Sequence, residues 1–439
     1  MELFLIKGSQ LILSLSLLIV LHELGHFIPA KLFKTRVEKF YLFFDVKFSL
    51  FKKKIGDTVY GIGWLPLGGY VKISGMIDES MDTEQMAKPA QPWEFRAKPT
   101  WQRLIIMLGG VTVNLVLGFL IYMMVMFVWG RTIVTNDDLP NGLAPSAQAA
   151  AVGFLQGDKV LRVNDQEIVD VMDVNKWLFL RSAETVEVAR ANGAVETLSI
   201  PEDFGKSLFA SGEMLPLTPY FPAIIKKVVA ESPAATAGIM PNDRIVGVDD
   251  KAISSWPAVY EALQNRDEVF VNLRIERNNV LQNIRVHVAA KDSLGVYFVD
   301  TRIKPKAVTY SFTESIKEGF DYGYWTLYEY VAQFKFIFSK KGASQLGGFG
   351  TIASIFPAKW DWRMFWERTA LISIILAFMN VLPIPALDGG HVVFLTYEML
   401  TGRKPHQKVL EYAQMLGLIL LLALFVYANG NDVYRFLMN

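Results

Sequence analysis

The chain has 439 residues, of which 52% are hydrophobic and 20% are charged. A disordered chain would be far less apolar. A chain embedded in lipid over its whole length would carry fewer charges, because charge is costly in hydrocarbon. The composition therefore predicts membrane spans joined to folded aqueous domains. The 44 basic and 43 acidic residues nearly cancel, so nothing indicates nucleic-acid binding. No cysteine is present, so a zinc site could use only histidine, aspartate and glutamate.

Four segments approach the length that crosses a bilayer, namely 9–32, 104–129, 369–390 and the shorter 415–428. The first could also be a signal peptide, since Lys7 precedes its apolar run, but no cleavage site of small residues follows. Lysine and arginine are concentrated in 31–103 and 403–408, which predicts that both loops are cytoplasmic. Both termini and the long section 130–368 would then lie on the outer side.

An internal repeat occupies the section after the second apolar segment. The stretch 153–168, GFLQGDKVLRVNDQEI, aligns with 238–253, GIMPNDRIVGVDDKAI, at an offset of 85 residues. Each copy reads as a turn of small residues, a glycine turn and an alternating strand. The pattern resembles the bacterial, circularly permuted form of the PDZ domain, and the second copy matches better. A PDZ domain can add a peptide strand to its sheet edge, but these copies could equally serve as caps without a peptide ligand.

The end of the first apolar segment carries an HExxH motif, His22-Glu23-Leu24-Gly25-His26. Residues four apart lie on one face of a helix, so both imidazoles could bind one metal ion while Glu23 activates a bound water. A carboxylate near an apolar span is costly unless it has a partner or a function. The alternative is a polar helix end that reaches the membrane interface without binding metal.

A catalytic zinc needs a third protein ligand if one position is to stay open for water. Asp388 is the candidate, because it follows two prolines, Pro383 and Pro385, within the third apolar segment. Prolines interrupt helical hydrogen bonding, which membranes tolerate only where the freed backbone is buried in protein or lines a cavity. Asp388 could instead cap a helix that begins near His391. His391 could also contribute to the site in a minor role.

These motifs together resemble the site-2 protease family of intramembrane zinc metalloproteases, in particular its bacterial regulator of sigma-E protease branch. The resemblance rests on HELGH in the first span, PALDGG in a later one and the repeat between them, and it covers nearly the whole chain. It implies one zinc ion per chain, held by His22, His26 and Asp388. Glu23 would act as general base and then as general acid.

Five residues match the family's Asn-x-x-Pro-x-Pro-x-x-Asp-Gly pattern: Asn380, Pro383, Pro385, Asp388 and Gly389. The resemblance implies that Asn380 touches the substrate or the oxyanion. Asn114 of the second span would be structural or would support the metal site from behind, as would the two prolines.

The loop 55–77 contains two β-rich runs, 58–60 and 70–73, separated by glycines. They indicate a β-hairpin element, which resembles the family's re-entrant β-element, with Gly61, Ile62 and Gly63 as the strand that binds substrate backbone. An ordinary amphipathic hairpin is the alternative. The segment 310–340 is rich in aromatic residues but too charged to span, which favours an amphipathic helix at the outer face. The glycines at 347, 348 and 350 are interpreted as a flexible connection.

The expected fold is a polytopic α-helical membrane protein with four transmembrane helices, a re-entrant β-hairpin element and two α+β PDZ domains. The expected segments are the first transmembrane helix (1–35), a cytoplasmic loop with the hairpin (36–103), the second transmembrane helix (104–130), two PDZ domains (131–215 and 216–292), an interfacial helix with its connection (300–366), the third transmembrane segment (367–402), and a cytoplasmic turn with the fourth helix (403–439).

The expected function is intramembrane cleavage of single-span membrane proteins in the bacterial inner membrane. The resemblance implies that a transmembrane anti-sigma factor and remnant signal peptides are the substrates, in envelope-stress signalling. It also implies an upstream site-1 type protease that cuts the same substrate first. The active site would face the cytoplasmic side and the PDZ domains the periplasm. Two rivals are a PDZ scaffold with an inactive metal site and a zinc transporter or sensor. The intact HELGH motif with Asp388 argues against the first, and the almost purely apolar fourth span argues against the second.

Overall fold

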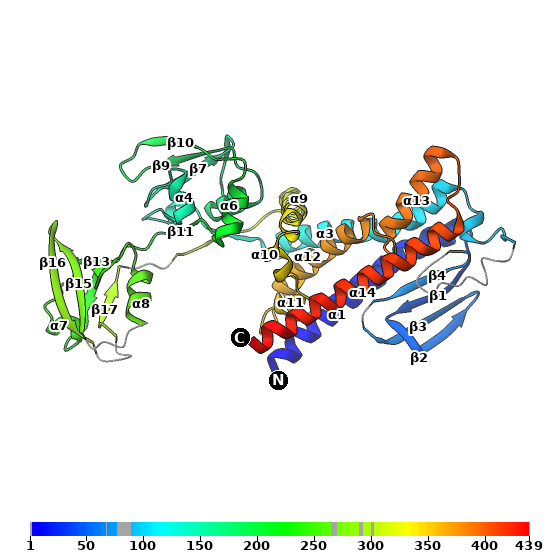
Figure 1. The fold of residues 1–439 in the computed structure, drawn as a ribbon, viewed down its shortest axis with the longest axis horizontal. Coiled ribbons are helices and arrows are strands. Elements are labelled where there is room, and N and C mark those ends of the chain that lie inside the picture. Colours follow the sequence, from blue (N-terminus) through cyan, green and yellow to red (C-terminus); the bar gives the residue numbers. More distant parts are fainter. Residues whose placement is uncertain are drawn as a thin grey trace. The chain divides into compact units, whose positions relative to one another are not determined.

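The computed structural model describes residues 2–66, 68–76, 89–264, 270–288, 293–299 and 303–438. Residues 67 and 77 of the expected hairpin region therefore lie outside the described residues. The chain forms two compact units, Met1–Arg131 with Thr309–Asn439, and Thr132–Val308. Figure 1 shows the elements of both.

Four described helices of the first unit are long and apolar enough to cross a membrane. They are α1 (Glu2–Leu32), α3 (Thr100–Trp129), α12 (Trp362–Val381) and α14 (Gln407–Met438). The fourth span was expected to be short, at 415–428, but α14 has 32 residues. Polar residues near its ends, such as Glu411 and Asp432, lower the hydropathy there without interrupting the helix. The third span was expected at 369–390, whereas α12 ends at Val381, just before Pro383.

The other described helices of this unit are α9 (Phe312–Ile337), α10 (Lys340–Gln345), α11 (Phe349–Ser354), α13 (Asp388–Thr401) and the 3-10 turn η1 (Phe95–Ala97). Helix α9 packs so closely on α3 that a Cβ added at Gly319 would collide with the Met123 backbone. The expected flexible glycine connection is instead the start of α11. The backbone N–H groups of Gly348 and Thr351 each donate to Asp432 Oδ2 at 3.0 Å, which fixes this start against α14.

A four-stranded sheet follows α1, built from β1 (Val37–Leu42), β2 (Phe44–Ile55), β3 (Thr58–Leu65) and β4 (Tyr70–Ile73). The strand order is β2-β3-β1-β4, with β3 parallel and β4 antiparallel to β1. The two runs expected to be β-rich are strands, but they do not pair with each other because β1 lies between them. The hairpin partner of β3 is β2. Sequence inspection missed this partner, since β2 is rich in lysine.

The second unit contains the repeat in two copies. The first copy comprises β6 (Leu143–Pro145), α4 (Ala147–Ala151), β7 (Lys159–Val163), β8 (Gln166–Glu167), α5 (Val174–Phe179), β9 (Thr185–Ala189), β10 (Val195–Ser199), α6 (Phe204–Ser211) and β11 (Leu217–Pro219). The second comprises β12 (Ile225–Val228), α7 (Pro233–Thr236), β13 (Arg244–Val248), β14 (Lys251–Ala252), α8 (Trp256–Gln264), β15 (Phe270–Arg277), β16 (Val280–His287) and β17 (Val296–Phe298). Two further strands, β5 (Arg131–Ile133) and β18 (Lys306–Val308), pair with each other.

The two copies share one strand arrangement. The larger sheets have the orders β10-β9-β7-β8 and β16-β15-β13-β14, and each copy adds a two-stranded sheet, β6 with β11 or β12 with β17. Two expected boundaries change as a result. Strand β11 begins at Leu217, after the expected end of the first domain at 215, yet it pairs with β6 of that domain. Strand β17 begins at Val296, beyond the expected end of the second domain at 292.

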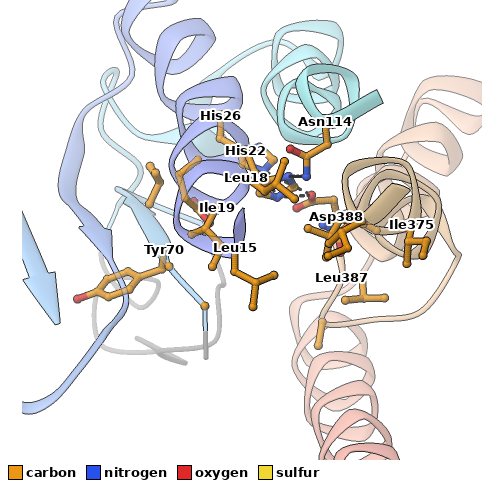
Figure 2. Close-up of a pocket in the computed structure, with 18 of the residues that line it drawn as sticks. Leu15, Leu18, Ile19, His22, His26, Tyr70, Asn114, Ile375, Leu387 and Asp388 are labelled. Atoms are coloured by element: carbon orange, nitrogen blue, oxygen red, sulfur yellow. Dashed lines mark hydrogen bonds and ion pairs between the residues drawn. The ribbon is translucent and has the colours of Figure 1, made fainter. Parts of the chain in front are cut away.

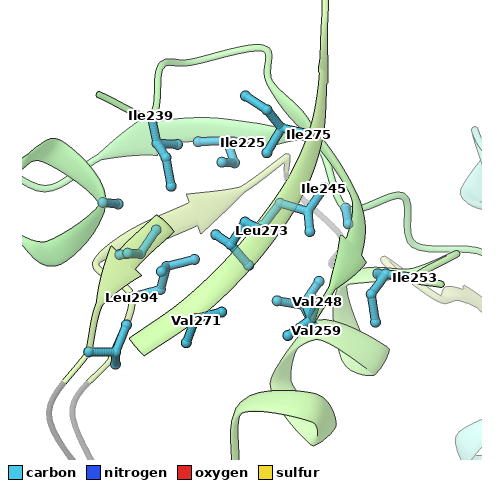
Figure 3. Packing of buried hydrophobic residues seen from close by; sticks show 14 residues of the cluster. Ile225, Ile239, Ile245, Val248, Ile253, Val259, Val271, Leu273, Ile275 and Leu294 are labelled. Carbon is cyan, nitrogen blue, oxygen red and sulfur yellow. The ribbon is translucent and has the colours of Figure 1, made fainter. Parts of the chain in front are cut away.

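The second copy has its own hydrophobic core, shown in Figure 3. Alternate residues of β15 point inward, and Val271, Leu273 and Ile275 are at most 1% exposed. They pack against Ile245 and Val248 of β13. The period of two in β15 is therefore the signal of a half-buried strand.

Candidate active site

The HExxH histidines and Asp388 meet at one point in the first unit, as Figure 2 shows. His22 Nε2 lies 3.2 Å from His26 Nε2. Asp388 Oδ2 lies 3.3 Å from His22 Nε2 and 3.4 Å from His26 Nε2. Tetrahedral zinc, with bonds of roughly 2.0–2.1 Å, separates its ligand atoms by about 3.3–3.4 Å. The three atoms therefore match one face of a zinc tetrahedron.

The surroundings of the Asp388 carboxylate also fit a bound metal ion. Its Oδ2 atom is buried and has no hydrogen-bond partner among the described residues. Buried polar atoms are almost always satisfied, so an unsatisfied carboxylate oxygen between two imidazoles needs an explanation. A cation bound by all three side chains provides one, and nitrogen with oxygen donors suits zinc.

Both imidazoles are held by their Nδ1 atoms, which leaves Nε2 directed at the metal position. His26 Nδ1 lies 2.8 Å from the Ile106 carbonyl oxygen, which can only accept, so Nδ1 carries the proton. His22 Nδ1 lies 3.2 Å from the Asn114 amide, whose Oδ1 atom is buried without a partner. A half-turn of that amide places Oδ1 where it accepts from His22 Nδ1–H. Such partners fix the orientation of metal-binding histidines.

A glycine on α3 makes room for the two rings. A Cβ added at Gly110 would collide with His26 Nε2, and it would lie 2.6 Å from a carbon of the His22 ring. Gly110 and Asn114 are four residues apart and lie on one face of α3. The same face therefore accommodates the imidazoles and orients one of them.

Asp388 owes its position to an irregular turn between α12 and α13. Ala386 has a positive φ of 77°, which is uncommon for a residue other than glycine. Gln414 of α14 accepts the Ala386 N–H at 3.2 Å, and Gly417 lets the Pro385 carbonyl approach α14 closely. Helix α13 begins at Asp388, its N-cap residue is Leu387, and no side chain caps it. The alternative in which Asp388 caps the helix is therefore not what the structure has.

The three side chains open into a cavity of about 580 Å³. Glu23 also lines this cavity and is 9% exposed. The Val71 backbone amide of β4 interacts with the Glu23 carboxylate. The apolar part of the wall comes mainly from α1 and α12, and it includes Leu15, Leu18, Ile19, Leu371, Ile372, Ile375 and Leu376. A carboxylic acid side chain thus faces a mainly apolar chamber.

Of the other residues expected in the site, some line the cavity or its supporting turn and others do not. Asn114 and Asn380 line the cavity, while Pro383 and Pro385 belong to the turn before Asp388. Gly61, Ile62 and Gly63 lie on β3, and none of them lines the cavity. Strand β3 pairs with β2 on one side and β1 on the other. It therefore has no free edge for a substrate strand, and the Tyr41 ring already fills the space above Gly61.

Sequence inspection did not assign several residues that build the site. The Ile106 carbonyl has no side-chain signal. Gly110 was visible only as a glycine near Asn114, and Gln414 only as a polar residue at the start of an apolar segment. Helix α11 also contributes to the cavity wall, through Phe349, Thr351 and Ile352. Because α11 is distant in sequence from the motifs, only the folded chain brings it to the site.

The sequence is similar to known peptidases over nearly its whole length. The model of peptidase family M50 matches residues 10–424, and the chain belongs to this family. A protein of Neisseria meningitidis named "Putative zinc metalloprotease" is 28% identical over 97% of this chain and 98% of its own. Regulator of sigma E protease of Haemophilus influenzae is 27% identical, and regulator of sigma-E protease RseP of Escherichia coli is 26% identical, each over 98% of this chain and 99% of its own.

Proposed function

We propose that this chain is a zinc metalloendopeptidase that cleaves single-span membrane proteins within or near the bilayer. Membership of peptidase family M50 supports the reaction class. The observation that carries the proposal is the triangle of two imidazole nitrogens and one unsatisfied carboxylate oxygen, with Glu23 beside it. The triangle adjoins α1 and α12, both apolar enough to cross a membrane, which supports chemistry at membrane depth.

Zinc is the cofactor, in line with the names of the relatives. His22, His26 and Asp388 would hold one ion. When bound, zinc polarises the scissile carbonyl and activates the water. The Ile106 carbonyl and Asn114 keep the imidazoles in the orientation that binding requires.

Glu23 is the general base and then the general acid. Its carboxylate takes a proton from the attacking water and later passes this proton to the leaving amine. Because Glu23 directly follows His22 on the helix, it stays beside the metal position throughout. Asn380 lines the same cavity and donates its amide to the substrate carbonyl or the developing oxyanion.

The substrate binds as an extended strand beside β4. A helical peptide bond is shielded by its own hydrogen bonds, so it must be unwound before water can attack. Among the described strands, β4 pairs only with β1, and its residues Tyr70 and Val71 line the cavity with Glu23. Addition of a strand at this edge replaces the hydrogen bonds that unwinding removes. This edge takes over the role first expected for Gly61, Ile62 and Gly63.

The cellular role follows the relatives that are named regulator of sigma-E protease. The chain acts in the bacterial inner membrane on a transmembrane anti-sigma factor, after an upstream protease has shortened it, and on remnant signal peptides. The active site faces the cytoplasmic side, and the two repeat copies, as PDZ domains, lie in the periplasm with both termini. They admit only shortened substrates, either by binding their new ends or by excluding large ones.

The test uses the full chain purified in detergent with a truncated single-span substrate. The parent is expected to contain one zinc ion and to cut the substrate, and Glu23→Gln is expected to lose cleavage by a factor of about 1,000 or more while it keeps zinc. Glu318→Gln, on α9, is the matched control, since Glu318 does not line the cavity. Cleavage by Glu23→Gln at the parent rate would refute the proposal.

A further inference from the structure

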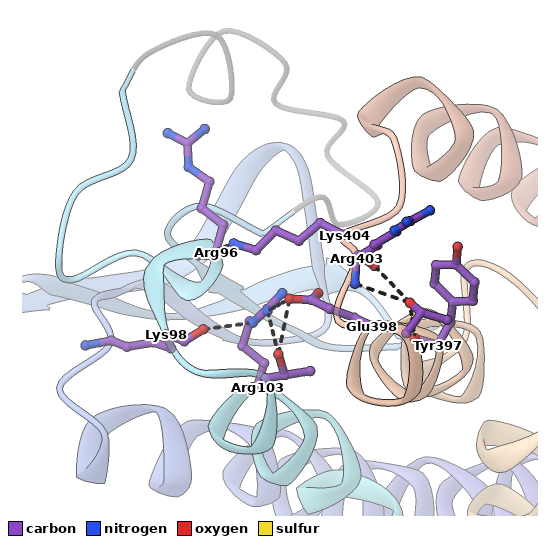
Figure 4. Close-up of polar contacts among 9 residues, drawn as sticks. Arg96, Lys98, Arg103, Tyr397, Glu398, Arg403 and Lys404 are labelled. Atoms are coloured by element: carbon purple, nitrogen blue, oxygen red, sulfur yellow. Dashed lines mark hydrogen bonds and ion pairs between the residues drawn. The ribbon is translucent and has the colours of Figure 1, made fainter.

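A buried ion pair joins the beginning of α3 to the end of α13. Arg103 Nη2 lies 2.5 Å from Glu398 Oε1, and the two side chains are only 8% and 9% exposed. Thr100 Oγ1 donates to the same carboxylate oxygen at 3.1 Å, and Arg103 Nε donates to the Lys98 carbonyl at 3.0 Å. Figure 4 shows this network. The neighbouring side chains are largely apolar, including Phe95 and Leu395.

The pair lies on the same helix faces as the candidate metal site. On α3, four residues at helical spacing form one stripe: Arg103, Met107, Gly110 and Asn114. Gly110 and Asn114 contact the histidines. On α13, the stripe runs from Asp388 through His391 and Leu395 to Glu398. The ion pair joins α3 to α13 directly. At the other end the two helices meet through α1, because His22 contacts Asn114 and lies 3.3 Å from Asp388.

The two stripes have matching lengths. Asp388 and Glu398 are ten residues apart, which corresponds to about 15 Å along a helix, and Arg103 and Asn114 are eleven apart, or roughly 16 Å. A slip of α13 by one turn would move it about 5.4 Å along α3 and separate both ends at once. Only one register therefore satisfies the ion pair and brings Asp388 to the histidines.

The connection between α12 and α13 does not by itself determine that register. Helix α13 is not continuous with α12, because residues 382–387 are irregular and contain the positive φ of Ala386. A turn of this kind transmits neither rotation nor axial position reliably from one helix to the next. Gln414 restrains the turn itself, but it does not restrain the far end of α13. A contact near Glu398 is needed for that.

We propose that Arg103 and Glu398 are positioning residues, which set the register of α13 against α3 and so hold the Asp388 carboxylate opposite His22 and His26. The inference rests on the proposed metal site. A buried ion pair is poor evidence for stability, because well-packed apolar residues often replace it without loss. Its best-attested use is to select one register among several, since a slip leaves both charges buried without partners.

The test separates register from stability with three variants of the full chain in detergent. Glu398→Gln leaves Arg103 without its charged partner, and the double variant Arg103→Met with Glu398→Leu replaces the pair by apolar side chains. Arg363→Gln removes a pair within α12, Arg363 with Glu367, which spans no helix contact and serves as the control. The readouts are the zinc dissociation constant from competition with a chelator, and the thermal midpoint of the zinc-free protein.

In the double variant, the zinc affinity and the thermal midpoint are expected to change independently of each other. Glu398→Gln is expected to bind zinc about tenfold or more weakly and to melt earlier. The double variant is expected to melt at the parent midpoint or above it, yet to keep the weakened zinc binding. Its kcat should fall more than its KM rises, because Asp388 acts at the reacting centre rather than in substrate binding. The control should match the parent in both readouts.

Two outcomes would overturn the inference. If the double variant recovers both the thermal midpoint and the zinc affinity of the parent, the pair is only structural. If Glu398→Gln binds zinc as tightly as the parent, the pair does not position Asp388. Either result leaves the proposed peptidase intact, provided that the parent binds zinc and Glu23→Gln is inactive. A parent that binds no zinc would instead remove the proposed function, and the inference with it.

Discussion

Two carboxylates, the partly buried Asp388 of the first unit and the buried Asp243 of the second, have opposite surroundings. Asp243 is 1% exposed and is fully bonded by its own chain. Arg277 donates Nε to Oδ1 at 2.7 Å and Nη2 to Oδ2 at 2.6 Å, and the Met240 N–H donates to Oδ2 at 2.8 Å. Asp388 has two imidazoles beside it, and its Oδ2 atom has no hydrogen bond from the described residues.

The difference separates a carboxylate whose oxygens are both hydrogen-bonded by the chain from one whose Oδ2 atom has no described hydrogen bond. A buried charge needs a partner of opposite charge. In the repeat the partner is an arginine of the same chain, and the site is closed. Burial raises the pKa of Asp243, but the hydrogen bonds from Arg277 and Met240 outweigh it and leave the pKa below its usual value. At Asp388 the two imidazoles leave Oδ2 without a hydrogen bond, and the proposed zinc would supply the missing positive charge.

The first prediction concerns removal of the negative charge of Asp388. Asp388→Asn should lower peptide cleavage by a factor on the order of 1,000 or more, because it removes a ligand of the proposed zinc. The zinc-free protein should be as stable as the parent or more so, since a buried charge without a closed ion pair has been removed. Cleavage, zinc content and thermal midpoints with and without a chelator measure this contrast. A large loss of stability in the zinc-free variant would contradict it.

The second prediction concerns removal of the negative charge of Asp243. Asp243→Asn should destabilise the second copy by about 1.5–3 kcal/mol at neutral pH, because it weakens the charge-assisted hydrogen bonds from Arg277. Hydrogen exchange of the β13 and β15 amides in the full chain measures this locally. The site chemistry lies in the other unit, so zinc content should not change. A variant with parent-like exchange would remove the contrast with Asp388.

The pH dependence of this second effect has a definite sign. The pKa of Asp243 is lower in the folded state than in the unfolded chain, so its stabilising effect is complete above the unfolded value of about 3.9. That effect disappears as the pH falls through the folded value. The difference between the parent and Asp243→Asn should therefore be constant from pH 7 to about pH 5 and should shrink below about pH 4.

The local parts of the site were predictable from the sequence, because local geometry determines them. The spacing of His22 and His26 places two imidazoles on one helix face in any α-helix. The prolines before Asp388 indicated a break that a membrane tolerates only in a functional context. The repeat was visible because both copies place glycine, aspartate and alternating apolar residues at the same offsets, with Asp158 in the position of Asp243.

The parts that depend on pairing between distant segments were not predictable. Nothing in the run 70–73 indicates that β1, rather than the strand at 58–60, lies beside it. Likewise, β11 pairs with β6 across about 70 residues, so the domain boundary was placed too early. Strand pairing is decided by packing in three dimensions and by loop closure, which short windows of sequence do not contain. The supporting contacts of the site, such as Gln414 with Ala386, are non-local for the same reason.

The smallest predicted effect concerns Asp158, which occupies in the first copy the position of Asp243 in the second. Arg190 gives it one hydrogen bond at 2.7 Å and directs its other nitrogen to Glu196, so Asp158 Oδ1 has no described partner. Burial therefore dominates and raises the pKa of Asp158. Asp158→Asn should change the stability of the first copy by no more than about 1 kcal/mol at neutral pH, because Arg190 keeps Glu196.

The direction of the pH effect makes this last prediction sharp despite its size. A raised folded pKa gives stability that is present below the unfolded value and is lost as the pH rises through the folded one. On acidification, the parent should therefore gain stability in the first copy relative to Asp158→Asn, while the Asp243 difference in the second copy shrinks. Hydrogen exchange of β7 and β13 in the same sample follows both copies at once. Slopes of equal sign would show that one aspartate position of the repeat has the same role in both copies, and opposite slopes would show that the arginine geometry decides it.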